Sequence, residues 1–173
     1  MANGASRPLF WSVAGGVVLA DFITKVIAVA TLSRVPVRVI GDAVTFQLVY
    51  NPGAAFGINV GEYSRWVFMV LALLALFVLG GMVRQTDGAQ WVRLTALAAV
   101  CGGAVGNLID RVRSPLGVVD FIDVGIGSLR WPTFNVADAA VTCGAITLAV
   151  VLWAEGRHDA QPEEHTTAPV SSS

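Results

Sequence analysis

The chain has few charged residues, which excludes an ordinary water-soluble domain. Asp, Glu, Lys and Arg make up 13% of its 173 residues, whereas 55% are hydrophobic and the mean hydropathy is +0.68. A soluble domain carries about 25% charged residues. The formal net charge of −1 leaves no electrostatic case for binding nucleic acid. The length suits one compact membrane domain.

Residues for several catalytic and metal-binding chemistries are scarce as well. The two histidines, His158 and His165, both lie in the polar C-terminal tail. The two cysteines, Cys101 and Cys143, lie in apolar runs without the spacing of a disulfide framework or a metal site, so we interpret them as small hydrophobic residues. No serine has a base at a suggestive spacing. We therefore expect neither a metal nor any other cofactor.

Four apolar segments are long enough to cross a bilayer, for which about 20 residues suffice. They are approximately Leu9–Ala30, Arg65–Met82, Trp91–Val112 and Phe134–Trp153. The tryptophans fall near the predicted ends, as interfacial aromatic residues do: Trp11, Trp66, Trp91, Trp131 and Trp153. The first segment could be a cleavable signal peptide, but its length and its charged Asp21 and Lys25 favour a retained helix.

The segment between the first two predicted helices differs from the rest. Val35–Ile40 and Val44–Tyr50 are rich in β-branched residues, and Gly41 and Asp42 between them indicate a turn. These features predict a small antiparallel β-sheet outside the bilayer core. Arg113–Pro132, which contains proline and several glycines, is predicted to be a loop. The predicted fold class is thus a membrane α-helical protein with four transmembrane helices and a β-cradle between helices one and two.

We predict a single integral-membrane domain over residues 1–156 and a disordered tail over residues 157–173. Four crossings place both termini on one side of the membrane. The distribution of arginines between the two sides does not choose which side that is.

Polar residues gather at four predicted helix ends that alternating crossings bring to the same membrane face. They are Asp21 and Lys25 in the first helix, Asn51 before the second, Asn107, Asp110 and Arg111 at the end of the third, and Asn135 and Asp138 at the start of the fourth. Their spacing of three or four residues places them on one face of each helix. In lipid such polar faces must turn inward and satisfy one another, which predicts a single site.

Asp120, in the loop that joins two of these ends, and Asp138 are the candidate catalytic pair. Two carboxyls that share a proton can activate a water and polarise a peptide carbonyl, as in aspartic proteases. The alternatives are that Asp120 caps a turn and that Asp138 interacts favourably with a helix dipole.

The remaining polar residues have mainly structural interpretations. Asp21 and Lys25 are interpreted as an internal ion pair, and Asp110 with Arg111 as a similar support. Asn51 lies in a turn that is either a plain connector or a contact for an extended substrate.

Five sequence blocks together resemble one family. The blocks are Asp21-Phe22-Ile23-Thr24-Lys25, Asn51-Pro52-Gly53-Ala54-Ala55-Phe56-Gly57, Gly106-Asn107-Leu108-Ile109-Asp110-Arg111, Val118-Val119-Asp120-Phe121 and Phe134-Asn135-Val136-Ala137-Asp138. In this order they resemble bacterial lipoprotein signal peptidase (signal peptidase II), over roughly Leu9 to Trp153.

The resemblance implies an aspartic endopeptidase of the bacterial inner membrane. Its substrate would be a diacylglyceryl-modified prolipoprotein, cut just before the lipidated lipobox cysteine. It implies that Asp120 and Asp138 are the catalytic pair, and that the other polar residues named above surround the site. It also implies a periplasmic or outer-face site, an extracytoplasmic sheet, cytoplasmic termini, and inhibition by globomycin. We expect contact with membrane lipid and a monomer.

The substrate would enter in the plane of the bilayer, with the sheet around Val35–Tyr50 as its cradle. We predict that the loop Asn51–Gly57, or a short helix after it, acts as a mobile lid. Two other functions fit the residues alone: a proton-coupled transporter, and a scaffold whose polar clusters only hold helices together.

Overall fold

The computed structural model describes residues 3–33, 35–53 and 61–159 of the chain. Its long helices are α1 (Asn3–Thr31), α2 (Ser64–Gln85), α3 (Trp91–Arg113) and α4 (Val136–Asp159), and a short 3-10 helix, η1 (Gly61–Tyr63), precedes α2. Within the described ranges, four helices are long and apolar enough to cross a membrane. The prediction of four transmembrane helices is therefore confirmed. The predicted boundaries err mainly at the outer ends, since α1 begins before Leu9 and α4 continues beyond Trp153.

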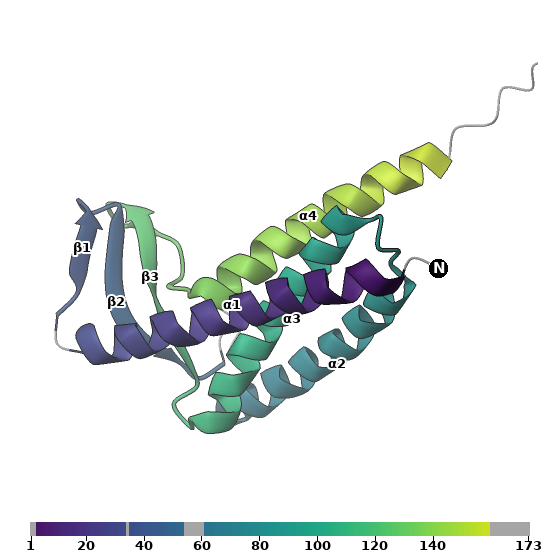
Figure 1. The fold of residues 1–173 in the computed structure, drawn as a ribbon. Helices are drawn as coiled ribbons and strands as arrows, with labels where there is room; N and C mark the ends of the chain where they lie inside the picture. Colours follow the sequence, from purple (N-terminus) through teal and green to yellow (C-terminus); the bar gives the residue numbers. More distant parts are fainter. Residues whose placement is uncertain (1–2, 34, 54–60, 160–173) are drawn as a thin grey trace, which may run out of the picture.

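Helix α3 lies at the centre of the bundle and packs against α1, α2 and α4 (Figure 1). Two of its glycines explain how its neighbours approach so closely. A Cβ atom added to Gly102 would lie 2.8 Å from the carbonyl oxygen of Ala14 in α1, and one added to Gly103 would clash with that of Ala137 in α4. Small residues on one helix thus let two other backbones come into contact with it, which fixes the relative positions of α1, α3 and α4.

The sheet has four antiparallel strands in the order β1-β2-β3-β4. The strands are β1 (Val37–Ile40), β2 (Val44–Asn51), β3 (Val118–Ile126) and β4 (Leu129–Arg130). Both predicted strands are present, but the sheet is not confined to the segment between the first two helices. Strands β3 and β4 come from Arg113–Pro132, which was wrongly predicted to be a loop. The β-branched residues of β3 find a partner in β2, a pairing between distant segments that local turn signals could not reveal.

The sheet is held against the C-terminal part of α1, which extends beside it (Figure 1). Ala28 of this part, and Leu32 directly after the helix, form a buried cluster with Phe121 of β3. Phe46 of β2 packs edge-on against Phe121, with ring centroids 6.2 Å apart. Because Phe121 is fixed in this way, its neighbour Asp120 is placed at the end of the bundle where α3 ends and α4 begins.

Candidate active site

Lys25 of α1 is the centre of a buried network that joins three helices. Its Nζ lies 2.7 Å from Asp21 Oδ2 and 2.8 Å from Asp110 Oδ2, and donates to Asn107 Oδ1 at 3.0 Å. An ammonium group has three donors, so these three acceptors satisfy it completely. Lys25 is only 4% exposed. The ion pair interpreted from the sequence is thus present, and it extends from α1 to α3.

Asp21 also reaches α4. Its Oδ1 accepts a hydrogen bond of 2.9 Å from the backbone N–H of Ala137, one of the N–H groups in the first turn that lack a partner within the helix. A Cβ atom added to Gly106 would lie 2.7 Å from Asp21 Oδ2, so the glycine leaves room for this carboxylate. Asp21 therefore fixes the start of α4 relative to α1.

Asn135 and Asp138 cap α4 reciprocally. The backbone N–H of Asp138 donates to Asn135 Oδ1 at 2.9 Å, and the backbone N–H of Asn135 donates to Asp138 Oδ2 at 3.2 Å. This is the capping-box arrangement, with the side chain at the helix start and the carboxylate three residues later each satisfying a backbone donor. Asp138 therefore does lie in the first turn of α4 and stabilises the start of that helix, as the alternative interpretation predicts. This structural role does not conflict with a role in catalysis.

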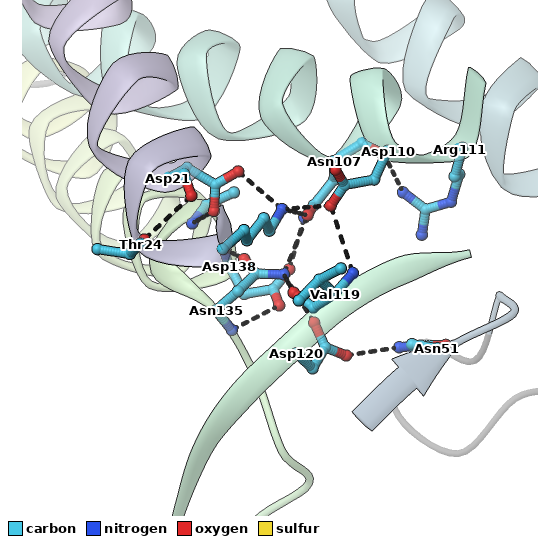
Figure 2. A network of polar contacts seen from close by, with 12 residues as sticks. Asp21, Thr24, Asn51, Asn107, Asp110, Arg111, Val119, Asp120, Asn135 and Asp138 are labelled. Carbon is cyan, nitrogen blue, oxygen red and sulfur yellow. Dashed lines mark hydrogen bonds and ion pairs between the residues drawn. The ribbon is translucent and has the colours of Figure 1, made fainter. Parts of the chain in front are cut away.

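The side chain of Asn135 links the two candidate carboxyls (Figure 2). Its Nδ2 donates to Asp120 Oδ1 at 2.7 Å, while its backbone N–H and its Oδ1 are bonded to Asp138. Asn107 completes the link, because its Nδ2 donates to Asp138 Oδ1 at 2.7 Å and its Oδ1 accepts from Asn135 Nδ2 at 3.1 Å. Asn135 is fully buried, so its amide holds both carboxyls with little freedom to rotate.

Asp120 is placed by the pairing of β2 with β3. Asn51 lies opposite Val118 in the register, so Asp120 is its diagonal neighbour on β3. Asn51 Nδ2 donates to Asp120 Oδ2 at 3.1 Å, and Asn51 Oδ1 accepts from the backbone N–H of Gly53 at 3.0 Å. Asn51 therefore forms the turn and also binds Asp120, whereas its contact with an extended substrate stays a prediction.

Burial has a strong electrostatic effect on Asp120, which is 2% exposed. Loss of solvation, and then the negative charge of Asp138, raise the pKa of Asp120 to about 6, although the hydrogen bonds from Asn51 and Asn135 and the charge of Lys25 oppose the shift. A carboxyl that holds its proton to near neutral pH can act as a general acid.

Arg111 lies beside the carboxyls as the nearby positive charge on α3. Its guanidinium interacts electrostatically with Asp110, Asp120 and Asp138, and its Nη1 donates to the carbonyl oxygen of Asn107 at 3.3 Å. Its buried Nε has no hydrogen-bond partner among the described residues. All nine polar residues predicted for the site are thus brought to one end of the bundle.

Two further polar contributions were not predicted. Asp123 of β3 is 7% exposed and accepts hydrogen bonds from Arg130 Nε at 2.8 Å and Gln47 Nε2 at 3.0 Å. Arg65 at the start of α2 donates from Nε to the carbonyl oxygen of Arg111 at 2.6 Å. The first could have been found by treating Val118–Ile126 as a strand, but the second had no signal in the sequence.

Within the described part of the chain, no group of three or more His, Cys, Asp or Glu side chains is arranged to hold a metal ion. The predicted lid cannot be compared with the structure in full, because residues 54–60 of that region lie outside the described ranges.

Known proteins match this chain over most of its length. The family model described as signal peptidase (SPase) II matches residues 13–154. A lipoprotein signal peptidase of Rhodococcus jostii is 44% identical over 153 residues, covering 84% of this chain and 72% of the relative. One from Treponema denticola is 40% identical over 148 residues, covering 81% and 86%.

Solved structures agree with these matches. A bacterial membrane enzyme solved by the in meso method at 2.3 Å resolution has a TM-score of 0.76 and 29% identity, covering 90% of this chain and 93% of that one. A second, solved at 1.9 Å, has a TM-score of 0.71 and 32% identity, covering 83% and 91%.

Proposed function

Because this chain belongs to the signal peptidase II family, we propose that Asp120 and Asp138 are its catalytic pair. The chain is an aspartic-type membrane peptidase that cleaves signal peptides from prolipoproteins. This decides against the transporter and scaffold alternatives. The observation that carries the residue assignment is the double link through Asn135, which bonds to Asp120 through Nδ2 and to Asp138 through its backbone N–H and Oδ1.

The two carboxyls divide the chemistry between them. Asp120, with its pKa raised to about 6, holds the shared proton and donates a hydrogen bond to the scissile carbonyl oxygen. Asp138 takes a proton from the attacking water as the water oxygen bonds to the carbonyl carbon. The resulting tetrahedral intermediate collapses when a proton passes to the peptide nitrogen, which leaves as an amine.

The other polar residues position the pair or the substrate. Asn107 and Asn135 orient the two carboxyls, and the group of Asp21, Lys25 and Asp110 holds α1, α3 and α4 in register around them. Arg111 has a buried Nε without a hydrogen-bond partner in the described residues. It is a group for binding a peptide carbonyl of the substrate. Asn51 supports Asp120 from the sheet.

The substrate is a prolipoprotein whose lipobox cysteine carries a diacylglyceryl group, cut on the N-terminal side of that cysteine. The site lies at one end of an apolar bundle, and this part of α1 also carries exposed apolar side chains such as Ile23 and Val26, so acyl chains and an apolar signal helix can approach from the bilayer. The sheet beside the site can hold the peptide extended. The enzyme acts as a monomer and is inhibited by globomycin.

The location follows from the same proposal. The protein lies in the bacterial inner membrane with the site toward the periplasmic or outer face and both termini in the cytoplasm. Residues 1–156 form the peptidase domain, and residues 157–173 form a cytoplasmic tail.

The test is cleavage of a diacylglyceryl-modified prolipoprotein by detergent-purified Asp120→Asn and Asp138→Asn. We expect each to lose activity by on the order of 10²–10⁴-fold or more, with the elution volume and thermal stability of a folded protein. Asp42→Asn is the control, since Asp42 is an exposed carboxylate that pairs with Arg38. Folded variants at Asp120 or Asp138 with near-normal cleavage would refute the assignment, and activity equally lost in Asp42→Asn would show that the effect is not local. Globomycin should block the wild-type reaction.

A further inference from the structure

A long groove crosses the bundle from the membrane face opposite the candidate site to Phe22 and Ile109, which adjoin the site residues Asp21 and Asp110. It has a volume of about 1050 Å³ and lies between α1 and α2, with α3 as its floor. Pockets for small molecules usually have about 300–1,000 Å³, so this groove is large enough for a long apolar ligand. It exists because α1 and α2 do not pack against each other anywhere in their described residues.

The groove runs along much of α1 and is lined mostly by apolar residues. It extends from Arg7 to Phe22 on α1, which spans about 22 Å at the rise of an α-helix. One leaflet of a bilayer has a hydrocarbon depth of about 15 Å. The groove is therefore longer than one leaflet is deep, so an acyl chain can lie in it along the whole length of the chain.

Two glycines leave the groove open along its walls. Gly15 of α1 and Gly80 of α2 both line it, and a Cβ atom added to either would meet no atom within 4 Å. Neither glycine is therefore required for contact between helices, in contrast to Gly102 and Gly103.

One end of the groove is basic. Arg7 from α1 and Arg84 from α2 line it at the membrane face opposite the candidate site. Both are exposed, and neither is in an ion pair with a carboxylate of the described residues. Two arginines above an apolar groove between helices suit an anionic lipid headgroup, since a guanidinium can bind a phosphate through two hydrogen bonds.

We propose that this groove binds one anionic phospholipid, with its phosphate between Arg7 and Arg84 and an acyl chain along α3. The charge argues against the signal helix of the substrate as the occupant. A signal peptide has a positively charged N-terminal region, which Arg7 and Arg84 would repel. A substrate acyl chain would enter from the site face and would make no use of the arginines. A second copy of this chain would have to present acidic groups to Arg7 and Arg84 in order to occupy the groove.

The test is native mass spectrometry of the full-length protein from mixed micelles containing equal amounts of phosphatidylglycerol and phosphatidylcholine with the same acyl chains. We expect the wild type to retain one phosphatidylglycerol. Arg7→Gln with Arg84→Gln should weaken retention by about fivefold for each arginine. Arg157→Gln is the control, because Arg157 is exposed at the same membrane face and stacks on Trp153 but does not line the groove.

A second pair of variants tests the apolar part. Gly15→Leu with Gly80→Leu should fill the groove and abolish retention of either lipid. Gly16→Leu with Gly81→Leu is its matched control, since these glycines are equally unobstructed but do not line the groove. Equal retention of both lipids, equal loss in Arg157→Gln, or retention that survives Gly15→Leu with Gly80→Leu would overturn the proposal. So would displacement of the lipid by a lysine-flanked apolar peptide, or a dimer in place of the lipid adduct.

These outcomes do not depend on catalysis. Asp120→Asn should keep the lipid although it loses cleavage, so that failure of one proposal can be told from failure of the other.

Discussion

At the scale of the residue, the site depends on an amide that both donates and accepts. Asn135 donates from Nδ2 to Asp120 and accepts at Oδ1 from the backbone N–H of Asp138. An aspartate at this position would lose the donor and place a third buried charge beside two carboxyls. A leucine would lose both functions and leave buried partners unsatisfied. Of asparagine, aspartate and leucine, which are similar in size, only asparagine can join the two acids in this way.

Lys25 has a comparable role for charge. It offsets the carboxylates of Asp21, which is buried, and of Asp110, which is partly buried, with 2.7 and 2.8 Å between the charged atoms. Removing the lysine would leave two uncompensated charges, which costs far more than an exposed ion pair contributes. The network is therefore best described as a unit that fixes the helix ends beside the proposed catalytic pair, Asp120 and Asp138.

The raised pKa of Asp120 predicts a specific pH dependence. Burial and the charge of Asp138 raise this pKa to about 6, so Asp120 is protonated below that pH and loses its proton as the pH rises through it. If Asp120 is the acid, kcat/KM should fall by about tenfold per pH unit well above this value. It should also fall at low pH, when the second carboxyl of the pair is protonated. The measurement is the pH–rate profile in detergent micelles with a short substrate, so that chemistry limits the rate.

Folding stability should change in the same range. The folded state holds a proton on Asp120 that the unfolded chain releases above a pKa of 3.8. The contribution of this group to the free energy of unfolding therefore falls as the pH rises from about 4 to 6.

For the pH–rate profile, a kcat/KM that stays flat from pH 5 to 8 would contradict Asp120 as the acid.

At this scale the sequence predicted well which residues meet. Asp21 with Lys25, and Asn107 with Asp110, lie one turn apart, and polar faces in lipid have few partners besides one another. The sequence could not predict which of these residues is hydrogen-bonded to which. That Asn135 rather than a direct contact joins the carboxyls, and that Arg65 bonds to the last carbonyls of α3, depends on distances between elements far apart in sequence.

At the scale of the element, strand β3 determines where Asp120 lies. It pairs with β2 on one side, and its Phe121 packs on the end of α1. The signal for β3 in the sequence is weak, since Pro115, Gly117 and Gly125 surround its β-branched residues. The signal for the transmembrane helices is strong, because a run of about 20 apolar residues is rarely anything but a membrane span. Hydropathy is a local property, whereas strand pairing is not.

Gly117 offers a test of that placement. Its φ is 95°, and an added Cβ would clash with the carbonyl oxygen of Asn51. Gly117→Ala should therefore push the start of β3 away from Asn51, weaken the contact of Asn51 with Asp120, and lower kcat strongly. The measurement is steady-state cleavage together with thermal unfolding.

Gly127→Ala is the matched control for Gly117→Ala. Gly127 also has a positive φ, 57°, but an added Cβ meets no atom within 4 Å. It should cost only the backbone strain of about 1 kcal/mol and leave kcat unchanged. Equal kinetic effects of the two substitutions would mean that strain, and not the approach of Asn51, causes the loss in Gly117→Ala.

At the scale of the whole molecule, the two ends of the bundle differ in character. The site end contains the network around Lys25. The opposite end is closed by a more exposed contact, in which Arg93 of α3 pairs with Glu155 of α4 at 3.1 Å. Between them the interior of α3 is apolar, with Leu94, Leu97 and Ala98 almost completely buried. Polar groups of α3 thus do not continue across the membrane as an ion pathway would require.

Because the two ends of the bundle are distinct, the orientation of the protein in the membrane can be tested by labelling. In a chain with Cys101→Ser and Cys143→Ser, single cysteines are introduced as Ser128→Cys, in the exposed β3–β4 turn at the site end, and as Ala89→Cys, in the exposed α2–α3 turn at the opposite end. If the site faces outward, a membrane-impermeant maleimide should label Ser128→Cys in spheroplasts and label Ala89→Cys only after permeabilisation. The reverse pattern would overturn the proposed orientation. Labelling of both from one side would contradict helices that cross the membrane at all, because the two turns lie at opposite ends of α3.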